Sequence, residues 1–210
     1  MYKARPTTAA CVGVLLLSTL IWAPASAAGA GWRVNGTTLT GSEALSWYAQ
    51  VDAQNVLKGA GVTITCSGAS VNSEHLQIEA SNKGSTTQLE FTGCSTTAPC
   101  AVGAKIATKP LTLEATLEGT LAVVATLAPK TGTLITTLEF AGTECSLAGT
   151  QPVSGHAKLL APTGQDERTV QLVNEITTEA SGELKIGSAA ASLSGSELFT
   201  LTSCKGWSFL

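Results

Sequence analysis

The stretch that decides the fold class is Leu111-Thr112-Leu113-Glu114-Ala115-Thr116-Leu117-Glu118, in which apolar and polar side chains alternate at every position. Successive side chains of a β-strand point to opposite faces, so a period of two predicts a strand with one buried and one exposed face. The same alternation recurs at 62–66, 88–91, 137–140, 170–176, 184–186 and 199–201. We therefore expect strands along the whole chain.

Turn-forming residues separate these runs at short intervals. They occur at Asn35-Gly36, 82–84, 129–132, 162–164 and 181–182. An Asn-Gly pair between two β-prone runs is the strongest short-range signal of a β-hairpin. Short strands joined by turns predict an all-β fold, an antiparallel β-sandwich or barrel.

One segment departs from the alternation. Between Glu43 and Lys58, four residues lie near helical spacing: Leu45, Tyr48, Val51 and Val56. The segment is ambiguous, and we expect at most one short helix there.

Two segments resemble each other, Gln88–Cys94 (QLEFTGC) and Thr137–Cys145 (TLEFAGTEC). A fainter copy, Thr116–Thr120 (TLEGT), lies between them. The spacings between the three strings are unequal, which indicates similar strand ends rather than a repeat architecture.

The first 27 residues predict a cleaved signal peptide. Lys3 and Arg5 precede an apolar run from Ala9 to Trp22, and small residues follow Pro24 up to Ala27. This order of basic, apolar and small residues is typical of export signals, and the run is shorter than the roughly 20 residues that span a bilayer. We expect cleavage after Ala27 and a secreted protein, extracellular or in the cell envelope.

Residues 28–210 are expected to form a single all-β domain without a transmembrane segment. Loss of Lys3 and Arg5 leaves ten basic against fifteen acidic side chains. A net acidic chain without a Lys/Arg cluster argues against nucleic acid as a partner.

Five cysteines follow the predicted cleavage point: Cys66, Cys94, Cys100, Cys145 and Cys204. In an exported protein they are expected to form disulfides rather than metal sites. The short spacing of Cys94 and Cys100 favours their pairing, and Cys66 with Cys145 is then the second pair. Cys204 is left as a free thiol or an intermolecular link. Spacing does not determine connectivity, so other pairings stay open.

Several short strings occur in order along the chain: Trp32–Thr37, Val62–Cys66, Phe91–Cys94 with Cys100, Thr108–Leu111, and Cys145 followed by Val153–Gly155. Taken together, they resemble uncharacterised secreted proteins of soil bacteria, especially actinobacteria. The resemblance covers most of residues 28–210 and implies a secreted, β-rich fold. It supplies no functional residues.

The sequence offers no catalytic or metal-binding motif. His75 and His156 are the two histidines, and neither lies in a zinc-enzyme motif. The string Ser154-Gly155-His156 resembles part of a hydrolase site, but neighbouring strand residues point to opposite faces and Gly155 favours a bulge or turn. We therefore predict no catalytic residues, no metal and no cofactor.

Trp47 and Tyr48 are the best candidates for a binding surface, because aromatic rings stack on ligands such as carbohydrates. The sequence thus favours a secreted, non-enzymatic binding or structural module with a protein or carbohydrate ligand. The alternatives are an adhesin-like subunit of a surface fibre and a secreted hydrolase, and Cys204 offers a route to self-association.

Overall fold

The computed structural model describes residues 31–49, 54–70, 76–118, 122–162, 169–176, 183–203 and 205–209. Every regular element in these ranges is a β-strand, which confirms the predicted all-β class. The predicted signal peptide, His75 and Cys204 lie outside the described residues.

The strands are β1 (Trp32–Val34), β2 (Thr37–Thr38), β3 (Ser42–Ala49), β4 (Asn55–Gly59), β5 (Val62–Ser70), β6 (Leu76–Glu79), β7 (Lys83–Thr86), β8 (Glu90–Thr96), β9 (Ala101–Val102), β10 (Lys105–Ala107), β11 (Leu111–Glu118), β12 (Ala122–Pro129), β13 (Leu134–Ala141), β14 (Gly149–Gly155), β15 (Ala157–Pro162), β16 (Thr169–Ile176), β17 (Leu184–Ile186), β18 (Ala189–Leu201) and β19 (Trp207–Phe209).

The ambiguous segment between Glu43 and Lys58 contains two strands, β3 and β4, and no helix in the residues described there. Both strands pair antiparallel with β18, one after the other along its length. Pairing with a common neighbour, which the local spacing does not show, decides the conformation of this segment.

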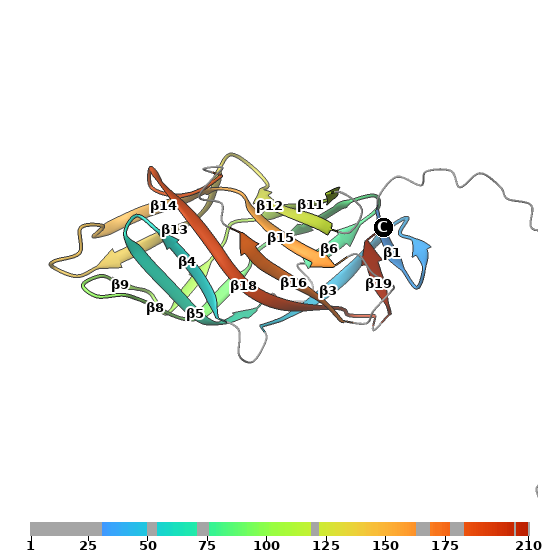
Figure 1. The fold of residues 1–210 in the computed structure, drawn as a ribbon, viewed down its shortest axis with the longest axis horizontal. Helices are drawn as coiled ribbons and strands as arrows, with labels where there is room; N and C mark the ends of the chain where they lie inside the picture. The colour runs from blue at the N-terminus through green and yellow to red at the C-terminus, as the bar shows by residue number, and fades with distance from the viewer. Residues whose placement is uncertain are drawn as a thin grey trace, which may run out of the picture.

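Antiparallel pairings among the described strands close one barrel-like ring and form a second that has a gap between β8 and β13. The first ring runs β3-β6-β7-β11-β12-β15-β16-β18 and back to β3. The second runs from β18 through β4, β5 and β8, and returns through β13, β14 and β17. β18 belongs to both rings and crosses the middle of the elongated molecule (Figure 1).

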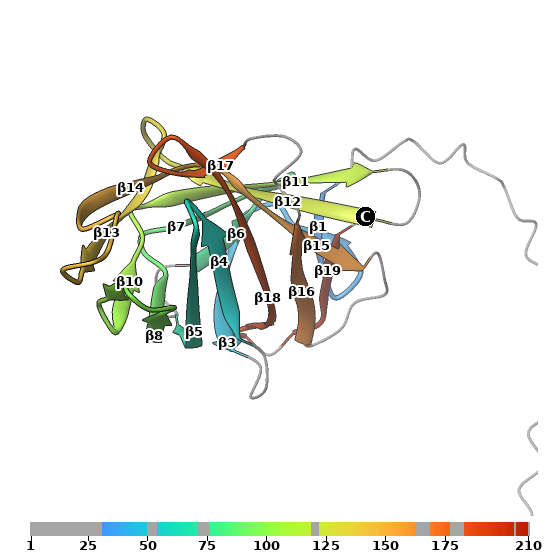
Figure 2. The same cartoon turned by 60° about the vertical axis from the view of Figure 1, so that its left-hand side comes forward.

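Residues 101–107 span the gap in the second ring. β10 pairs with β8, placing Ile106 opposite Phe91, and β9 pairs with β13, placing Val102 opposite Phe140. The two segments that resemble each other in sequence thus overlap β8 and β13, the strands that pair with β10 and β9. Figure 2 shows β10 beside β8.

The core is one contiguous cluster that extends through both rings. The inward residues of β11, Leu111, Leu113 and Ala115, are 2%, 6% and 1% exposed, as the alternation predicts. Buried side chains from β5, β13 and β17 continue the same cluster in the second ring.

A small three-stranded sheet, β19-β1-β2, packs at one end of the molecule. Asn35 and Gly36 form its turn with φ angles of 50° and 75°, so the predicted hairpin is confirmed. Trp32 packs against Trp207 and Phe209, with ring centroids 5.9 and 4.9 Å away. Its indole Nε1 donates a hydrogen bond to the carbonyl oxygen of Lys83 at 2.6 Å, which attaches the small sheet to the first ring.

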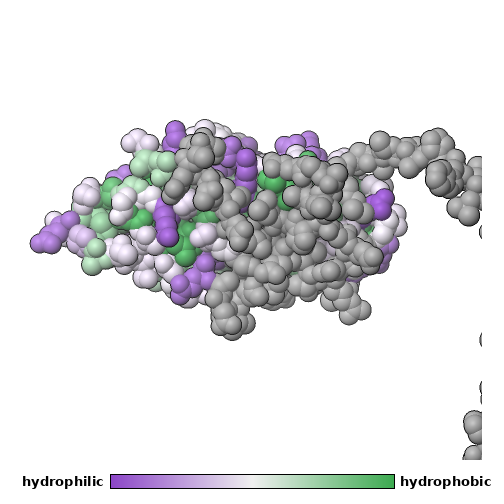
Figure 3. Space-filling model, in the orientation of Figure 1, coloured by the Kyte–Doolittle hydropathy of each residue, from purple (hydrophilic) through white to green (hydrophobic). Residues whose placement is uncertain are grey.

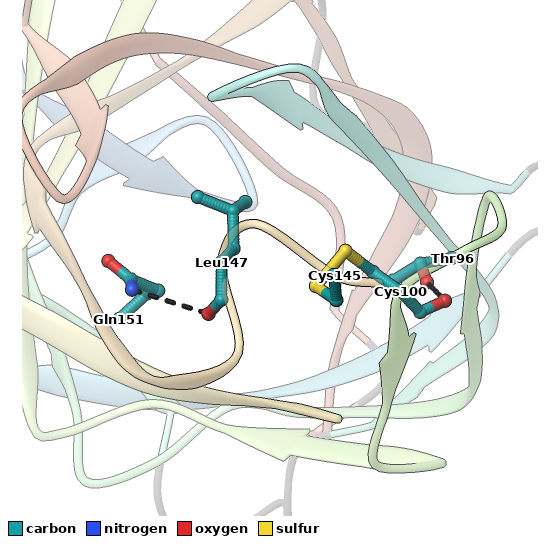
Figure 4. The surroundings of a disulfide bond; sticks show 5 residues. All are labelled: Thr96, Cys100, Cys145, Leu147 and Gln151. Carbon is teal, nitrogen blue, oxygen red and sulfur yellow. Dashed lines mark hydrogen bonds between the residues drawn. A yellow bond between two sulfur atoms is a disulfide. The ribbon is translucent and has the colours of Figure 1, made fainter. Parts of the chain in front are cut away.

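The predicted disulfide pairings are wrong, although all four cysteines are used. Cys66 bonds to Cys94 and Cys100 bonds to Cys145. Cys66 and Cys94 stand directly opposite each other on β5 and β8, with Cα atoms 3.9 Å apart. Cys100 lies beyond the end of β8 and reaches Cys145 after β13, with Cα atoms 4.7 Å apart (Figure 4).

Strand register therefore determines which cysteines form disulfides, whereas the prediction was based on closeness in sequence. The hydroxyl of Thr96 donates to the carbonyl oxygen of Cys100, and the side-chain amide of Gln151 donates to that of Leu147 at 3.3 Å. These bonds fix the chain on both sides of the Cys100–Cys145 bridge (Figure 4).

Tryptic digestion of the unreduced protein tests the connectivity. Cleavage after Lys58, Lys83, Lys105, Lys130 and Lys158 places Cys66 in peptide 59–83, Cys94 with Cys100 in 84–105, and Cys145 in 131–158. We expect one covalent assembly of all three peptides in the mass spectrum.

The pairing expected from sequence spacing would instead link 59–83 to 131–158 and leave 84–105 separate with an internal bond. Fragmentation at the bond before Pro99 divides Cys94 from Cys100 and assigns each one its partner. A separate, internally bridged 84–105 peptide would contradict the structure.

Candidate functional site

The candidate site is a cavity of about 110 Å³ at the junction of the two rings. The first ring contributes side chains such as Leu113 of β11 and Leu159 of β15. The second ring contributes side chains such as Ile64 of β5 and Val153 of β14. Ligand sites often lie at such junctions, because neither unit fills the space between them completely.

The cavity wall is almost entirely apolar. Among the described residues that line it, the polar side chains are those of Asn55, Thr108 and Thr136, which are 3%, 8% and 8% exposed. An engineered apolar cavity of about 150 Å³ stays dry and takes up benzene or xenon. The volume and lining found here therefore suit a small apolar group.

The hydroxyls of Thr108 and Thr136 form hydrogen bonds with backbone groups of the cavity wall. The hydroxyl of Thr108 accepts a hydrogen bond from the amide of Leu89 at 3.0 Å. The hydroxyl of Thr136 donates to the carbonyl oxygen of Ala107 at 2.6 Å. Both bonds fasten the connection between β10 and β11 to its neighbours, so these hydroxyls hold the wall together.

Asn55 occupies a different part of the wall, at the start of β4. It stands opposite Cys66 in the register of β4 and β5. On β18, Gly195 lies so close that a Cβ there would be 2.5 Å from Asn55 Oδ1. Because Gly195 has no side chain, the Asn55 amide can lie directly beside β18.

Charged side chains gather on the opposite face of the same wall. The Glu183 carboxylate lies 3.2 Å from His156 Nε2 and 3.3 Å from Lys158 Nζ. Ala157 and Leu159 of β15 line the cavity, so alternation turns Lys158 away from it. His156 precedes β15 and contacts the same carboxylate as Lys158.

Gly155 allows the backbone of Glu183 to approach the start of β15. Its φ angle is 105°, and a Cβ there would overlap the carbonyl oxygen of Glu183. The amide of His156 donates to that same oxygen at 3.2 Å. β14 ends at Gly155 and β15 begins at Ala157, so the strand is interrupted at His156.

Ser154 and His156 of the string Ser154-Gly155-His156 have different neighbours in the structure. Ser154 is opposite Lys185 in the register of β14 and β17, while His156 contacts Glu183. Two other carboxylates, those of Glu90 and Glu139, belong to β8 and β13. Glu90 forms an ion pair with Lys105 at 3.1 Å, and Glu139 accepts a hydrogen bond from Thr150 at 2.6 Å.

The aromatic candidates cannot be placed at the cavity. Trp47 and Tyr48 lie on β3, where their backbones pair with Phe199 and Leu198 of β18. Their side chains are outside what the structure describes. On the face shown in Figure 3, hydrophobic and hydrophilic residues intermingle over the second ring.

Sequence reasoning missed the cavity and Asn55. The lining residues come from strands distributed from β4 to β18, and no short motif contains them. Asn55 begins an apolar run, Asn-Val-Leu, and this position alone does not distinguish a buried amide from a turn residue.

Comparison with known proteins adds no relative: no family model, no curated protein and no solved structure matches the chain at a significant level. In the part of the chain that the structure describes, no helix has the length and apolarity needed to cross a membrane. The same residues contain no group of three or more His, Cys, Asp or Glu arranged to hold a metal ion.

The contact between Gly195 and Asn55 can be tested by stability. Gly195→Ala forces a Cβ against the buried amide and the backbone of Asn55, so the free energy of unfolding is expected to fall by about 1–3 kcal/mol. Urea denaturation of the purified protein measures the change.

Gly41→Ala is the matched control, because a Cβ at Gly41 would meet nothing within 4 Å. We expect it to leave stability within about 0.5 kcal/mol of the parent protein. Equal stability losses in the two variants would show that the Asn55 contact is not responsible.

Proposed function

We propose that this protein is an exported, non-enzymatic binding module that holds a small apolar ligand in the cavity between its two rings. The observation that carries the proposal is the composition of the cavity wall. Side chains such as Leu111, Leu127 and Phe199 surround a space of about 110 Å³, and the Thr108 and Thr136 hydroxyls in the wall bond to backbone groups.

Burial of apolar surface is the driving force available at such a site. Each Å² of apolar surface removed from water contributes roughly 25 cal/mol, so a single ring or short alkyl chain gains a few kcal/mol. The ligand is a small apolar molecule, or the apolar end of a larger one. This replaces the protein or carbohydrate ligand expected from the sequence, since the site is narrow and lacks stacked aromatic rings among its described residues.

Export is the second part of the proposal. The basic, apolar and small residues of 1–27 support it, together with the two intramolecular disulfides, which are typical of oxidising compartments. The resemblance to secreted actinobacterial proteins agrees with an extracellular or envelope location. Cys204, beyond the two bridges, stays a candidate for self-association.

A binding module also fits the strand pairings better than a fibre subunit does. Donor-strand assembly needs an open edge on a sheet. The two ends of the main strand path are β9 and β10, which belong to one segment that joins β13 to β8. Both strands are short, with 2 and 3 residues, and short edge strands disfavour intermolecular addition.

Toluene binding tests the proposed site. We expect toluene to raise the melting temperature of the oxidised protein and to bind with a 1:1 stoichiometry in calorimetry, because it fills an apolar cavity. Ala157→Leu puts an isobutyl group in place of a methyl group that lines the cavity, and should weaken toluene binding at least tenfold.

Ala141→Leu is the matched control, since Ala141 is exposed on β13 and is not among the residues that line the cavity. It should bind toluene as the parent protein does. If the parent protein binds no toluene, or if both variants lose binding equally, the cavity is a packing space and not the ligand site.

A further inference from the structure

Asn55 is the lining residue whose chemistry differs most from the rest of the wall. Asn55 is 3% exposed, and it lines the cavity together with apolar side chains such as Leu57, Ile64 and Leu193. The hydroxyls of Thr108 and Thr136 already bond to backbone groups that hold the wall together. Ligand sites typically combine an apolar wall with a few placed polar groups that fix orientation.

The position of Asn55 is held from two sides. In the register of β4, β5 and β8, Asn55 stands opposite Cys66, which stands opposite Cys94. The disulfide between the two cysteines ties β5 to β8 within this row. On the other side, Gly195 of β18 lets the amide approach the backbone closely. A polar group fixed in this way can select among ligands, because it cannot move aside for the wrong one.

We infer that Asn55 hydrogen-bonds a polar group of the ligand, so that the ligand class is an apolar molecule with one hydroxyl or carbonyl group. The inference rests on the proposed function. A carboxamide has two N–H donors and two oxygen lone pairs, so Asn55 can contact a ligand and keep its contacts within the protein. A buried site that hydrogen-bonds its ligand discriminates strongly against the analogue that lacks the polar group.

The pair phenol and toluene tests this inference, since the two molecules differ by a hydroxyl in place of a methyl group. Dissociation constants are measured by calorimetry for the parent protein, Asn55→Leu and Asn82→Leu. In Asn55→Leu we expect phenol to bind about fivefold to tenfold more weakly, as loss of one neutral hydrogen bond predicts, and toluene to bind as before or more tightly.

Asn82→Leu makes the same substitution at a site where the side-chain amide donates to Glu114 at 3.4 Å, outside the cavity lining. It should change neither affinity. A second measurement avoids dependence on the folding of Asn55→Leu: in the parent protein, phenol should shift the NMR signals of the Asn55 side-chain amide more than toluene does.

The outcomes separate the two proposals. If the parent protein binds toluene and phenol, but Asn55→Leu weakens both by the same factor and the amide signals respond equally, Asn55 only shapes the cavity and the inference is overturned. If the parent protein binds neither molecule, the proposed function fails and the inference fails with it.

Discussion

Backbone hydrogen bonding along β18 is the constraint on which the rest of the structure depends. This strand of 13 residues pairs with β4 and β17 in its first part and with β3 in its last part, while β16 runs beside residues 193–200. Both rings contain β18. The partner on one side changes from β4 to β3 next to Gly195, where Asn55 fills the space between strands. The cavity therefore lies beside β18, the strand that the two rings share.

The fold class could be predicted from the sequence because its signals are local. Alternation at 111–118 and the Asn35-Gly36 turn each need only a few neighbouring residues, and both reappear in the structure. The disulfide partners and the path of residues 43–58 depend on which strands become neighbours. Register between distant segments decides both, and the chain carries no local mark of it. The cavity was missed for the same reason, since its wall combines strands from β4 to β18.

Alternation also separates two kinds of chemistry on a single wall. Along β15, Ala157 and Leu159 face the cavity, while Lys158 points away from it and contacts the Glu183 carboxylate, as His156 does. The charged cluster can be solvated without bringing water to the apolar site. In the sequence, Ser154 and His156 are separated by one residue, which is why they suggested a hydrolase fragment. The three-dimensional arrangement assigns the polar residues and the cavity to opposite faces.

The small sheet at the chain ends has a mechanical consequence. In the antiparallel pair of β1 and β19, Trp32 is opposite Phe209 and Val34 is opposite Trp207, so both chain ends leave from the same end of the pair. A pulling force applied through the two ends would load these pairs one at a time, as in a zipper, and not all together in shear. Under tension the Trp32–Phe209 contact would yield first, and both rings would still be intact when the small sheet had peeled away.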